Sequence, residues 1–323
     1  MSNDIVIREQ KDYLDALKAR LGPDVAAVMI TNPNTCGLFE RDMKAISDAV
    51  HAAGGYVYCD GANFNAIVGK VRPGDLGVDA MHINLHKTFS TPHGGGGPGS
   101  GPVVLSEALS PYGPLPFTAR DKDGVVHLVE EENAAEYDHT QAFGRMTAFH
   151  GQMGMFTRAL TYILSHGADG LAQVAEDAVL NANYILRELE DVLHAPYGDS
   201  GPCMHEALFG DKGFAEDVST LDLAKALIDE GFHPMTMYFP LVVHGAMLVE
   251  PTETESKAGL DQFIGAPVVD EDRGDRMRQA RRMLRKEGLG AGAASLVAGS
   301  MAAELAAPAL VRGALDLDRR VRQ

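Results

Sequence analysis

The stretch HINLHKTFSTPHGGGGPGSGP, residues 82–102, decides how this chain is interpreted. It starts inside a short apolar segment, passes through the pair His86-Lys87 and opens into a glycine-rich loop. A buried strand that ends in this way delivers one lysine to the edge of a sheet, beside backbone that a ligand can approach closely. Asp60 ends an earlier apolar segment in the same manner. A lysine and an aspartate so placed form the arrangement that pyridoxal phosphate (PLP) chemistry requires.

Apolar runs alternate with helical patterns around this stretch. The patterns predict helices over 8–21 and 40–53, and strands over 25–30, 56–59, 79–85 and 102–105. Strands that alternate with helices are typical of an α/β fold with a parallel, doubly wound sheet. Such sheets bind ligands outside the carboxyl ends of their strands. The side chains expected to converge on one crevice there are those of Asn32, Asn34, Asp60 and Lys87.

The second half of the chain predicts a smaller unit. Long helices are expected over 140–165 and 168–193, and strands over 204–208 and 235–243. Thr252 and Glu255 fit a capping box that opens a helix. We therefore expect three parts, which are a partial large PLP-binding domain over 1–150, a connecting helix with a small α+β domain over 151–264, and an atypical basic tail rich in Ala, Gly and Arg over 265–323. The tail is interpreted as a poorly ordered or aberrant extension, with a basic docking arm as the alternative.

Composition limits the class of partner. The net charge of −17 and the pI of about 5.0 argue against nucleic acid or an anionic membrane surface, since both attract basic proteins. The three cysteines are odd in number and lack metal-ligand spacing, which indicates a reducing compartment and hence the cytoplasm. The segment 1–12 does not resemble a signal peptide, and no apolar run reaches the length of a membrane span.

Lys87 and Asp60 have the most specific expected roles. A lysine forms a Schiff base through its neutral amine, and the end of a buried strand would partly desolvate Lys87 and fix its position. A carboxylate beside a pyridine nitrogen keeps that nitrogen protonated, which suits Asp60, although Asp60 also fits a cap on the turn that follows it. Ala62 is small enough for a flat ring to lie against.

The remaining candidates are weaker. Asn32 or Asn34 could donate a hydrogen bond to the phenolic oxygen of the ring, or could simply form the Asn-Pro-Asn turn. His82 and His86 lie four residues apart, but a strand context and the absence of a glutamate after His82 argue against a metal site. His86 is interpreted as a wall of the active site or a proton carrier, with a structural histidine as the alternative.

Five segments resemble one known family, the glycine dehydrogenase (decarboxylating), which is the P-protein of the glycine cleavage system, and in particular subunit 2 of its two-subunit form. The resemblance covers about residues 10–264, and the segments that carry it are NPNTCGLFE (32–40), YCDGANFNAIVGKVRPGDLGVD (58–79), HINLHKTFSTPHGGGGPGSGP (82–102), EDAVLNANYI (176–185) and GFHPMTMYFPLVVHGAMLVEPTETESKAGLDQF (231–263). It implies the aspartate-aminotransferase-like fold type I, with PLP held covalently by Lys87. It also implies that Asp60 meets the ring nitrogen and that His86 and the glycine loop line the site.

The implied reaction is decarboxylation of glycine, with transfer of the aminomethyl group to the lipoyl group of a partner, the H-protein. A companion P-protein subunit 1 is implied as well. Compared with the family, the chain is expected to begin inside the large domain and to diverge after Ile264, as a fragmentary or frame-disrupted gene would. Two alternatives stay open, which are a catalytically inactive structural subunit and another fold type I enzyme such as an aminotransferase or a lyase.

Overall fold

The structure is a computed structural model that describes residues 10–92, 99–137, 141–214, 216 and 218–266. These residues fall into two compact units, each described by itself below. The first comprises the described residues up to Gly213 together with Met235–Ile264, and the second contains the described part of Phe214–Pro234 with residues 265–266. The predicted tail lies outside the described residues from 267 onward, and the predicted domain boundaries stay predictions.

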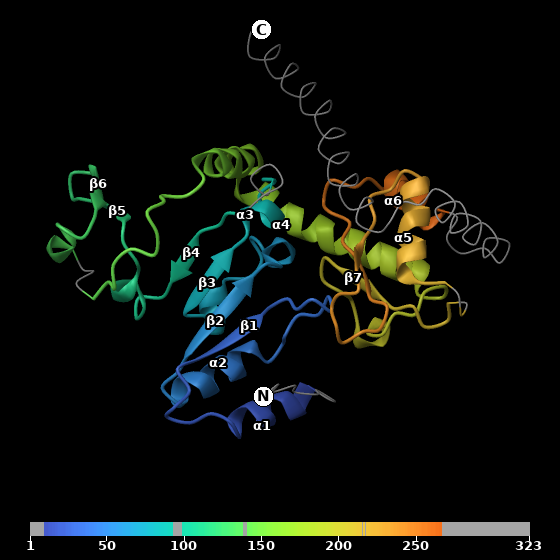
Figure 1. Ribbon diagram of the computed structural model, residues 1–323, viewed down its shortest axis with the longest axis horizontal. Coiled ribbons are helices and arrows are strands. Elements are labelled where there is room, and N and C mark those ends of the chain that lie inside the picture. The colour runs from blue at the N-terminus through green and yellow to red at the C-terminus, as the bar shows by residue number, and fades with distance from the viewer. Residues whose placement is uncertain (1–9, 93–98, 138–140, 215, 217, 267–323) are drawn as a thin grey trace, which may run out of the picture. The chain divides into compact units, whose positions relative to one another are not determined.

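The first unit is built on a four-stranded sheet in the order β1-β2-β3-β4 (Figure 1). Its strands are β1 (Ala27–Thr31), β2 (Tyr56–Gly61), β3 (Ala80–Ile83) and β4 (Val103–Leu105). β1, β2 and β3 are parallel, as the sequence predicts, and Asp60 of β2 is in register with His82 of β3. The α/β fold predicted for this part of the chain is therefore confirmed.

β4 corrects the prediction of a fully parallel sheet, because it pairs with β3 antiparallel. Among the described residues of the connection from β3, which are 84–92 and 99–102, the one helix is the short α3 (Leu85–Thr88). The returning segment already runs antiparallel beside the end of β3, because Leu85 N donates to Ser100 O and Ile83 N donates to Pro102 O before β4 begins. β3 also ends at Ile83, so the predicted strand over 79–85 is too long at its carboxyl end.

One face of the sheet is covered by α1 (Gln10–Lys18), α2 (Met43–Ala52) and the short helix η2 (Pro73–Leu76) (Figure 1). Met43, Val50 and Val57 are fully buried there, and partly buried apolar side chains of β1 and α1 pack around them. Apolar residues alternate along β2, so that Val57 and Cys59 face this core while Tyr58 and Asp60 face the other way. The polar side chains of the candidate site therefore share one face of the sheet.

The connecting helix begins later than predicted. α4 (Met153–Leu189) begins at Met153, whereas the sequence predicts a start at residue 140. The helix breaks at Gly167, where φ is 66° and ψ is −175°. The break coincides with the predicted division between two helices. α4 packs against η1 (Phe64–Ala66) and α3 with residues on both sides of this break, through a cluster that contains Val68, Leu85, Phe89, Ala159 and Ala175.

Between the predicted strand over 102–105 and the predicted helix from 140, where the sequence indicates no strand, the structure has a hairpin of β5 (Phe117–Arg120) and β6 (Val126–Val129). Leu115, Val129 and Ala134 form a small core beneath it. Alternating exposed and half-buried residues in these short strands are masked by charged neighbours in the sequence, which is why the hairpin was not predicted.

The small unit predicted after the connecting helix contains the antiparallel sheet β7-β9-β8, with β7 (Ala207–Phe209), β8 (Thr236–Met237) and β9 (Met247–Val249). The predicted strand over 235–243 covers β8 only, and β9 was missed because three apolar residues are too few to show a period. α6 (Lys257–Ile264) follows, and its first turn is capped by Ser256, whose Oγ accepts from Gly259 N at 3.1 Å. Thr252 is therefore not the cap that the sequence predicts.

The second compact unit contains α5 (Thr220–Asp229). Ser219 and Asp222 form a capping box at its start, in which the Ser219 side chain accepts from Asp222 N and the Asp222 carboxylate accepts from Ser219 N at 3.0 Å. Within the part of the chain that the structure describes, no helix combines the length and the apolar character that a membrane span needs.

Candidate active site

The loop after β1 is tied together by the two asparagines predicted to reach a cofactor. Both ends of the Asn32 amide are used, since Oδ1 accepts from Glu40 N at 3.0 Å and Nδ2 donates to Glu40 O at 3.3 Å. Asn34 Oδ1 accepts from Cys36 N and Leu38 N. The structure thus places both side chains in the turn, as the alternative interpretation expects, and their role toward a cofactor stays a prediction.

Asp60 stands at the carboxyl end of β2 on the polar face of the sheet. Its Oδ1 accepts from Ala62 N at 2.9 Å and lies 3.1 Å from His82 Nε2. The side chain keeps about a quarter of its surface exposed, 26%. The two interpretations of Asp60 therefore coexist, because one oxygen caps the following turn while the carboxylate stays open to a ligand.

His82 belongs to the neighbourhood of Asp60 and not to a metal pair with His86. Besides Asp60 it contacts Tyr58, whose Oη lies 2.8 Å from His82 Nδ1, and the two rings lie 5.8 Å apart. Sequence reasoning missed Tyr58 and the role of His82, because both depend on the register between β2 and β3.

Lys87 lies on α3, the helical turn that follows β3. Its backbone N–H donates to Asn84 O at 3.1 Å, which fixes the turn. The side chain is exposed, so the partial desolvation expected from the end of a strand is not seen in this chain. Its amine forms no hydrogen bond or ion pair with the described residues. α3 packs on η1, which follows the Asp60 turn, so the loops after β2 and β3 meet at one edge of the sheet.

The described part of the glycine loop runs beside β3 and α3. Ile83 N donates to Pro102 O at 3.0 Å, and Leu85 N donates to Ser100 O at 2.9 Å. A Cβ on Gly101 would lie 1.7 Å from Ile83 O, and one on Gly99 would lie 2.4 Å from the ring of His86. Glycine is needed here because the loop backbone lies close to β3 and to His86, whereas the close approach of a ligand stays a prediction. Residues 93–98, which include the four consecutive glycines of the predicted loop, lie outside the described residues.

An acidic wall that the sequence did not reveal, formed by His205, Glu206 and Glu250, completes the surroundings. His205 Nε2 lies 3.4 Å from Glu206 Oε1 and 3.5 Å from Glu250 Oε1. Asn63 donates to Glu206 at 3.4 Å and Asn65 donates to Glu250 at 3.0 Å. The loop after β2 therefore contacts the residue before β7 and the residue after β9. These residues come from separated segments, and no local pattern joins them.

The acidic wall faces the candidate lysine. Burial raises the pKa of Glu250, and the charge of Glu206 adds to this, whereas His205, the Asn65 hydrogen bond and the charge of Lys87 act in the opposite direction. The three acidic-wall side chains offer ligand atoms within 4.8 Å of one another, the one such grouping among the described residues. The positive charge of Lys87 opposes a divalent cation there, and we assign no metal to it.

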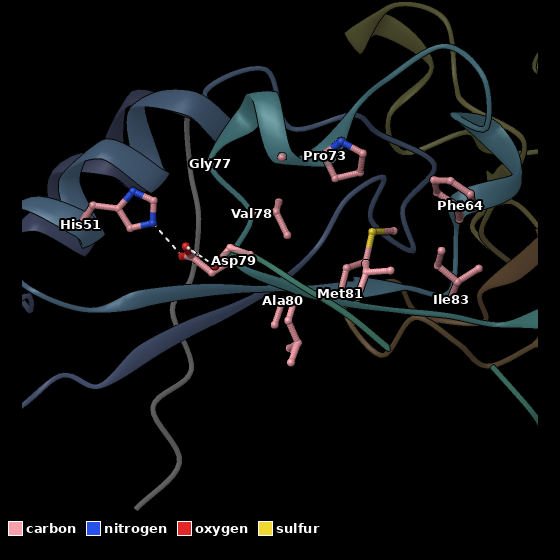
Figure 2. Close-up of a pocket in the computed structure, with 13 residues that line it drawn as sticks. His51, Phe64, Pro73, Gly77, Val78, Asp79, Ala80, Met81 and Ile83 are labelled. Atoms are coloured by element: carbon pink, nitrogen blue, oxygen red, sulfur yellow. Dashed lines mark hydrogen bonds and ion pairs between the residues drawn. The ribbon is translucent and has the colours of Figure 1, made fainter. Parts of the chain in front are cut away.

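A separate hollow of about 430 Å³ lies between η2 and strands β3 and β4 (Figure 2). Met81 and Ile83 point toward it, whereas Ala80 points to the opposite face of β3 (Figure 2). Its polar group, the Asp79 carboxylate, already accepts from Val57 N at 2.8 Å and pairs with His51 at 2.7 Å. The hollow contains neither Asp60 nor Lys87, so it is apart from the candidate site.

The structure thus brings Asp60, Ala62 and His82 into direct contact and places Lys87 and His86 on the adjoining turn. Asp60 and Lys87 do not form an ion pair with each other. The assignment of catalytic and cofactor-binding roles to these residues stays a prediction.

Comparison with solved structures identifies the fold. The chain superposes on glycine decarboxylase, the P-protein of the glycine cleavage system in inhibitor-bound form, with a TM-score of 0.61 and 22% identity over 77% of this chain and 56% of that chain. It also superposes on a cysteine desulfurase from Thermococcus onnurineus with a TM-score of 0.57 and 13% identity, over 81% of this chain and 64% of that one. The fold is therefore type I of the PLP-dependent enzymes, as predicted.

Sequence comparison is more specific. The chain is 69% identical over 251 residues to the probable glycine dehydrogenase (decarboxylating) subunit 2 of Caulobacter vibrioides, a match that covers 77% of this chain and 47% of the relative. It is 54% identical over 252 residues to the protein of the same description in Oceanobacillus iheyensis, over 78% of this chain and 50% of the relative. The family profile described as glycine dehydrogenase, C-terminal domain, matches residues 174–286. The chain spans about half the length of the curated relatives it matches, and over that part it is similar to glycine dehydrogenase (decarboxylating) subunit 2.

Proposed function

We propose that this chain carries the PLP-binding centre of a glycine decarboxylase and that Lys87 binds the cofactor. One observation carries the proposal. The Lys87 side chain is exposed and makes no hydrogen bond or ion pair with the described residues, and the partly exposed Asp60 carboxylate lies at the same edge of the sheet. The family relationship supports it, since relatives that are 49–69% identical are described as glycine dehydrogenase (decarboxylating) subunit 2.

The residues present fit PLP. The cofactor needs an amine for its aldehyde, a carboxylate for its ring nitrogen and a flat surface for the ring. Lys87 offers the amine, and the Asp60 side chain is anchored through Oδ1 while 26% of its surface stays open. Ala62, half-buried beside Asp60, leaves room for a ring. The bound cofactor would supply an electron sink for the bond to carbon dioxide.

Each side chain has a role that follows from its chemistry. Lys87 would hold the aldehyde of the cofactor through its amine. The negative charge of Asp60 keeps a proton on the ring nitrogen. His86, beside the glycine loop, lies where a proton is to be held or passed next to Lys87.

The substrate and partners are also proposals. Glycine as substrate is supported by the names of the relatives, and a lipoylated H-protein by the likeness to a P-protein of the glycine cleavage system. A companion subunit 1 is supported by the designation of the relatives as subunit 2. The cytoplasmic location is supported by three cysteines that are all free. The comparisons do not favour an aminotransferase, a lyase or an inactive subunit.

Isotope exchange tests the reaction. The chain is combined with the companion subunit, PLP and lipoylated H-protein, and the incorporation of labelled bicarbonate into the carboxyl group of glycine is measured. We expect exchange with the natural chain, none with Lys87→Ala, and normal exchange with Lys70→Ala, since Lys70 is paired with Glu176 away from the site. Absence of exchange in a chain that binds PLP through Lys87 would contradict glycine decarboxylation.

A further inference from the structure

We propose that Tyr58 and His82 are positioning residues that hold Asp60 by one oxygen and so present its other oxygen to the ring nitrogen of the bound cofactor. The inference rests on the proposed function, because it concerns the same carboxylate. Neither side chain was singled out for this role by the sequence, and neither is part of the cofactor's covalent chemistry.

The side chains of Tyr58, His82 and Asp60 lie in contact, one after the other, on one face of the sheet. Tyr58 and Asp60 are two residues apart in β2, which places them on the same face, and His82 is the register partner of Asp60 in β3. Figure 2 shows Met81 and Ile83 pointing to the opposite face from Ala80, and His82 alternates with both of them. The contacts are 2.8 Å from Tyr58 Oη to His82 Nδ1 and 3.1 Å from His82 Nε2 to Asp60 Oδ1.

When the imidazole is neutral, chemistry fixes where the protons lie in the hydrogen bond between Tyr58 and His82 and in the 3.1 Å contact between His82 and Asp60. An ionised carboxylate only accepts, so His82 Nε2 carries the proton that faces Asp60. In a neutral imidazole the other nitrogen is then an acceptor, and the phenol of Tyr58 donates to it. Tyr58 therefore sets which nitrogen of His82 carries the proton.

The contacts of Asp60 show that Tyr58 and His82 act on one oxygen of its carboxylate. Ala62 N donates to Oδ1 of this carboxylate, and His82 Nε2 lies 3.1 Å from the same oxygen. Among the described residues, no hydrogen bond falls on Oδ2. A carboxylate anchored through one oxygen has a fixed plane, and its second oxygen is left for a donor from outside the protein, such as a protonated ring nitrogen.

The surroundings of Tyr58 keep its phenol in the donating form. Burial raises the pKa of Tyr58, and the charges of Asp60 and Cys59 add to this. Cys59 itself points into the apolar core on the opposite face of β2. The phenol thus stays protonated at neutral pH.

The first experiment needs no cofactor. The chain is labelled with ¹³Cζ-tyrosine, the Tyr58 signal is assigned by its loss in Tyr58→Phe, and its titration is followed by NMR. We expect a midpoint above that of an ordinary tyrosine. His82→Ala should lower it, because the phenol loses its acceptor, and His82→Gln should retain it, because the amide can accept from Tyr58 and donate to Asp60. An equal midpoint in the natural chain and in His82→Ala would overturn the proposal.

The second experiment measures the dissociation constant of PLP by equilibrium dialysis. We expect Tyr58→Phe and His82→Ala to weaken binding about tenfold, the effect of one lost hydrogen bond in a charged network. His82→Gln should bind nearly as well as the natural chain. Tyr56→Phe is the matched control, since Tyr56 is in the same strand and makes no side-chain hydrogen bond among the described residues. Unchanged binding in both Tyr58→Phe and His82→Ala would overturn the proposal.

The two proposals fail in different ways. Failure of the proposed function is seen in the natural chain, when borohydride reduction with PLP leaves Lys87 unmodified. Failure of the present inference is seen in the variants. It is shown by a titration midpoint of Tyr58 that is unchanged in His82→Ala, or by a dissociation constant of PLP that is unchanged in both Tyr58→Phe and His82→Ala.

Discussion

At the scale of single residues, Asp60 shows why local sequence leaves alternatives open. The sequence offers a cap for the turn or a cofactor contact, and the structure accommodates both on different oxygens of one carboxylate. Its contact with His82 follows from the pairing of β2 with β3, which lie some twenty residues apart in the chain. Residue types at strand ends were predictable, whereas the partners that orient them were not, because tertiary register sets them.

The pH dependence of stability tests the burial of Cys203, which lies a few residues before β7. Burial raises the pKa of its thiol from 9.0 to about 12. Between these values the folded protein keeps a proton that the unfolded chain loses, so the free energy of unfolding falls as the pH rises above about 9. We expect a loss of about 1 kcal/mol between pH 8 and pH 10 through this group, measured by urea unfolding as the difference between the natural chain and Cys203→Ala.

Leu189→Ala is the control for this measurement, since Leu189 is similarly buried but carries no ionisable group. It should lower stability at both pH values and leave the pH dependence of the natural chain unchanged. If Cys203→Ala retains the full pH dependence, the thiol is not buried as described.

At the scale of elements, the glycine loop depends on its approach to β3. A Cβ at Gly101 would lie 1.7 Å from Ile83 O, so Gly101→Ala must displace the loop and break the bond from Ile83 N to Pro102 O. We expect a loss of about 1–3 kcal/mol in urea unfolding, together with weaker retention of PLP. Gly74→Ala, with open space around it, should change stability by less than about 1 kcal/mol. Equal effects at both positions would refute the described contact.

The break in α4 gives a second matched pair. Gly167 has φ 66° and ψ −175°, a conformation that is open essentially to glycine alone. Gly167→Ala should therefore destabilise the protein by about 1–3 kcal/mol. Gly154→Ala, in the same helix with open space around it, should be neutral or stabilise by up to about 1 kcal/mol. The measurement is the midpoint of urea unfolding, and a neutral Gly167→Ala would show that α4 is continuous.

Elements with a long apolar period were predicted, and short ones were not. α2, β1, β2 and the break of α4 follow from the sequence. β9 and the β5–β6 hairpin have three or four residues per strand, too few for an alternating pattern to stand out. The antiparallel direction of β4 depends on the path of the glycine loop, which its composition does not specify.

At the scale of the molecule, the candidate site combines segments that are far apart in the chain. Asp60 and Lys87 were found from the sequence because each follows a strand, and strand ends gather at one edge of an α/β sheet. The acidic wall of His205, Glu206 and Glu250 was missed because its residues flank strands of the small antiparallel sheet. No local sequence pattern indicates that this sheet contacts the loop after β2.

The central claim is that the Lys87 amine binds the aldehyde of PLP. The most direct measurement is to incubate the chain with PLP, reduce with borohydride, digest, and locate the pyridoxyl group by mass spectrometry. We expect modification concentrated on Lys87, and weaker retention of PLP in Asp60→Asn, because this substitution removes the charge that would meet the ring nitrogen. Modification that is absent from Lys87, or no greater there than on surface lysines such as Lys70, would contradict it.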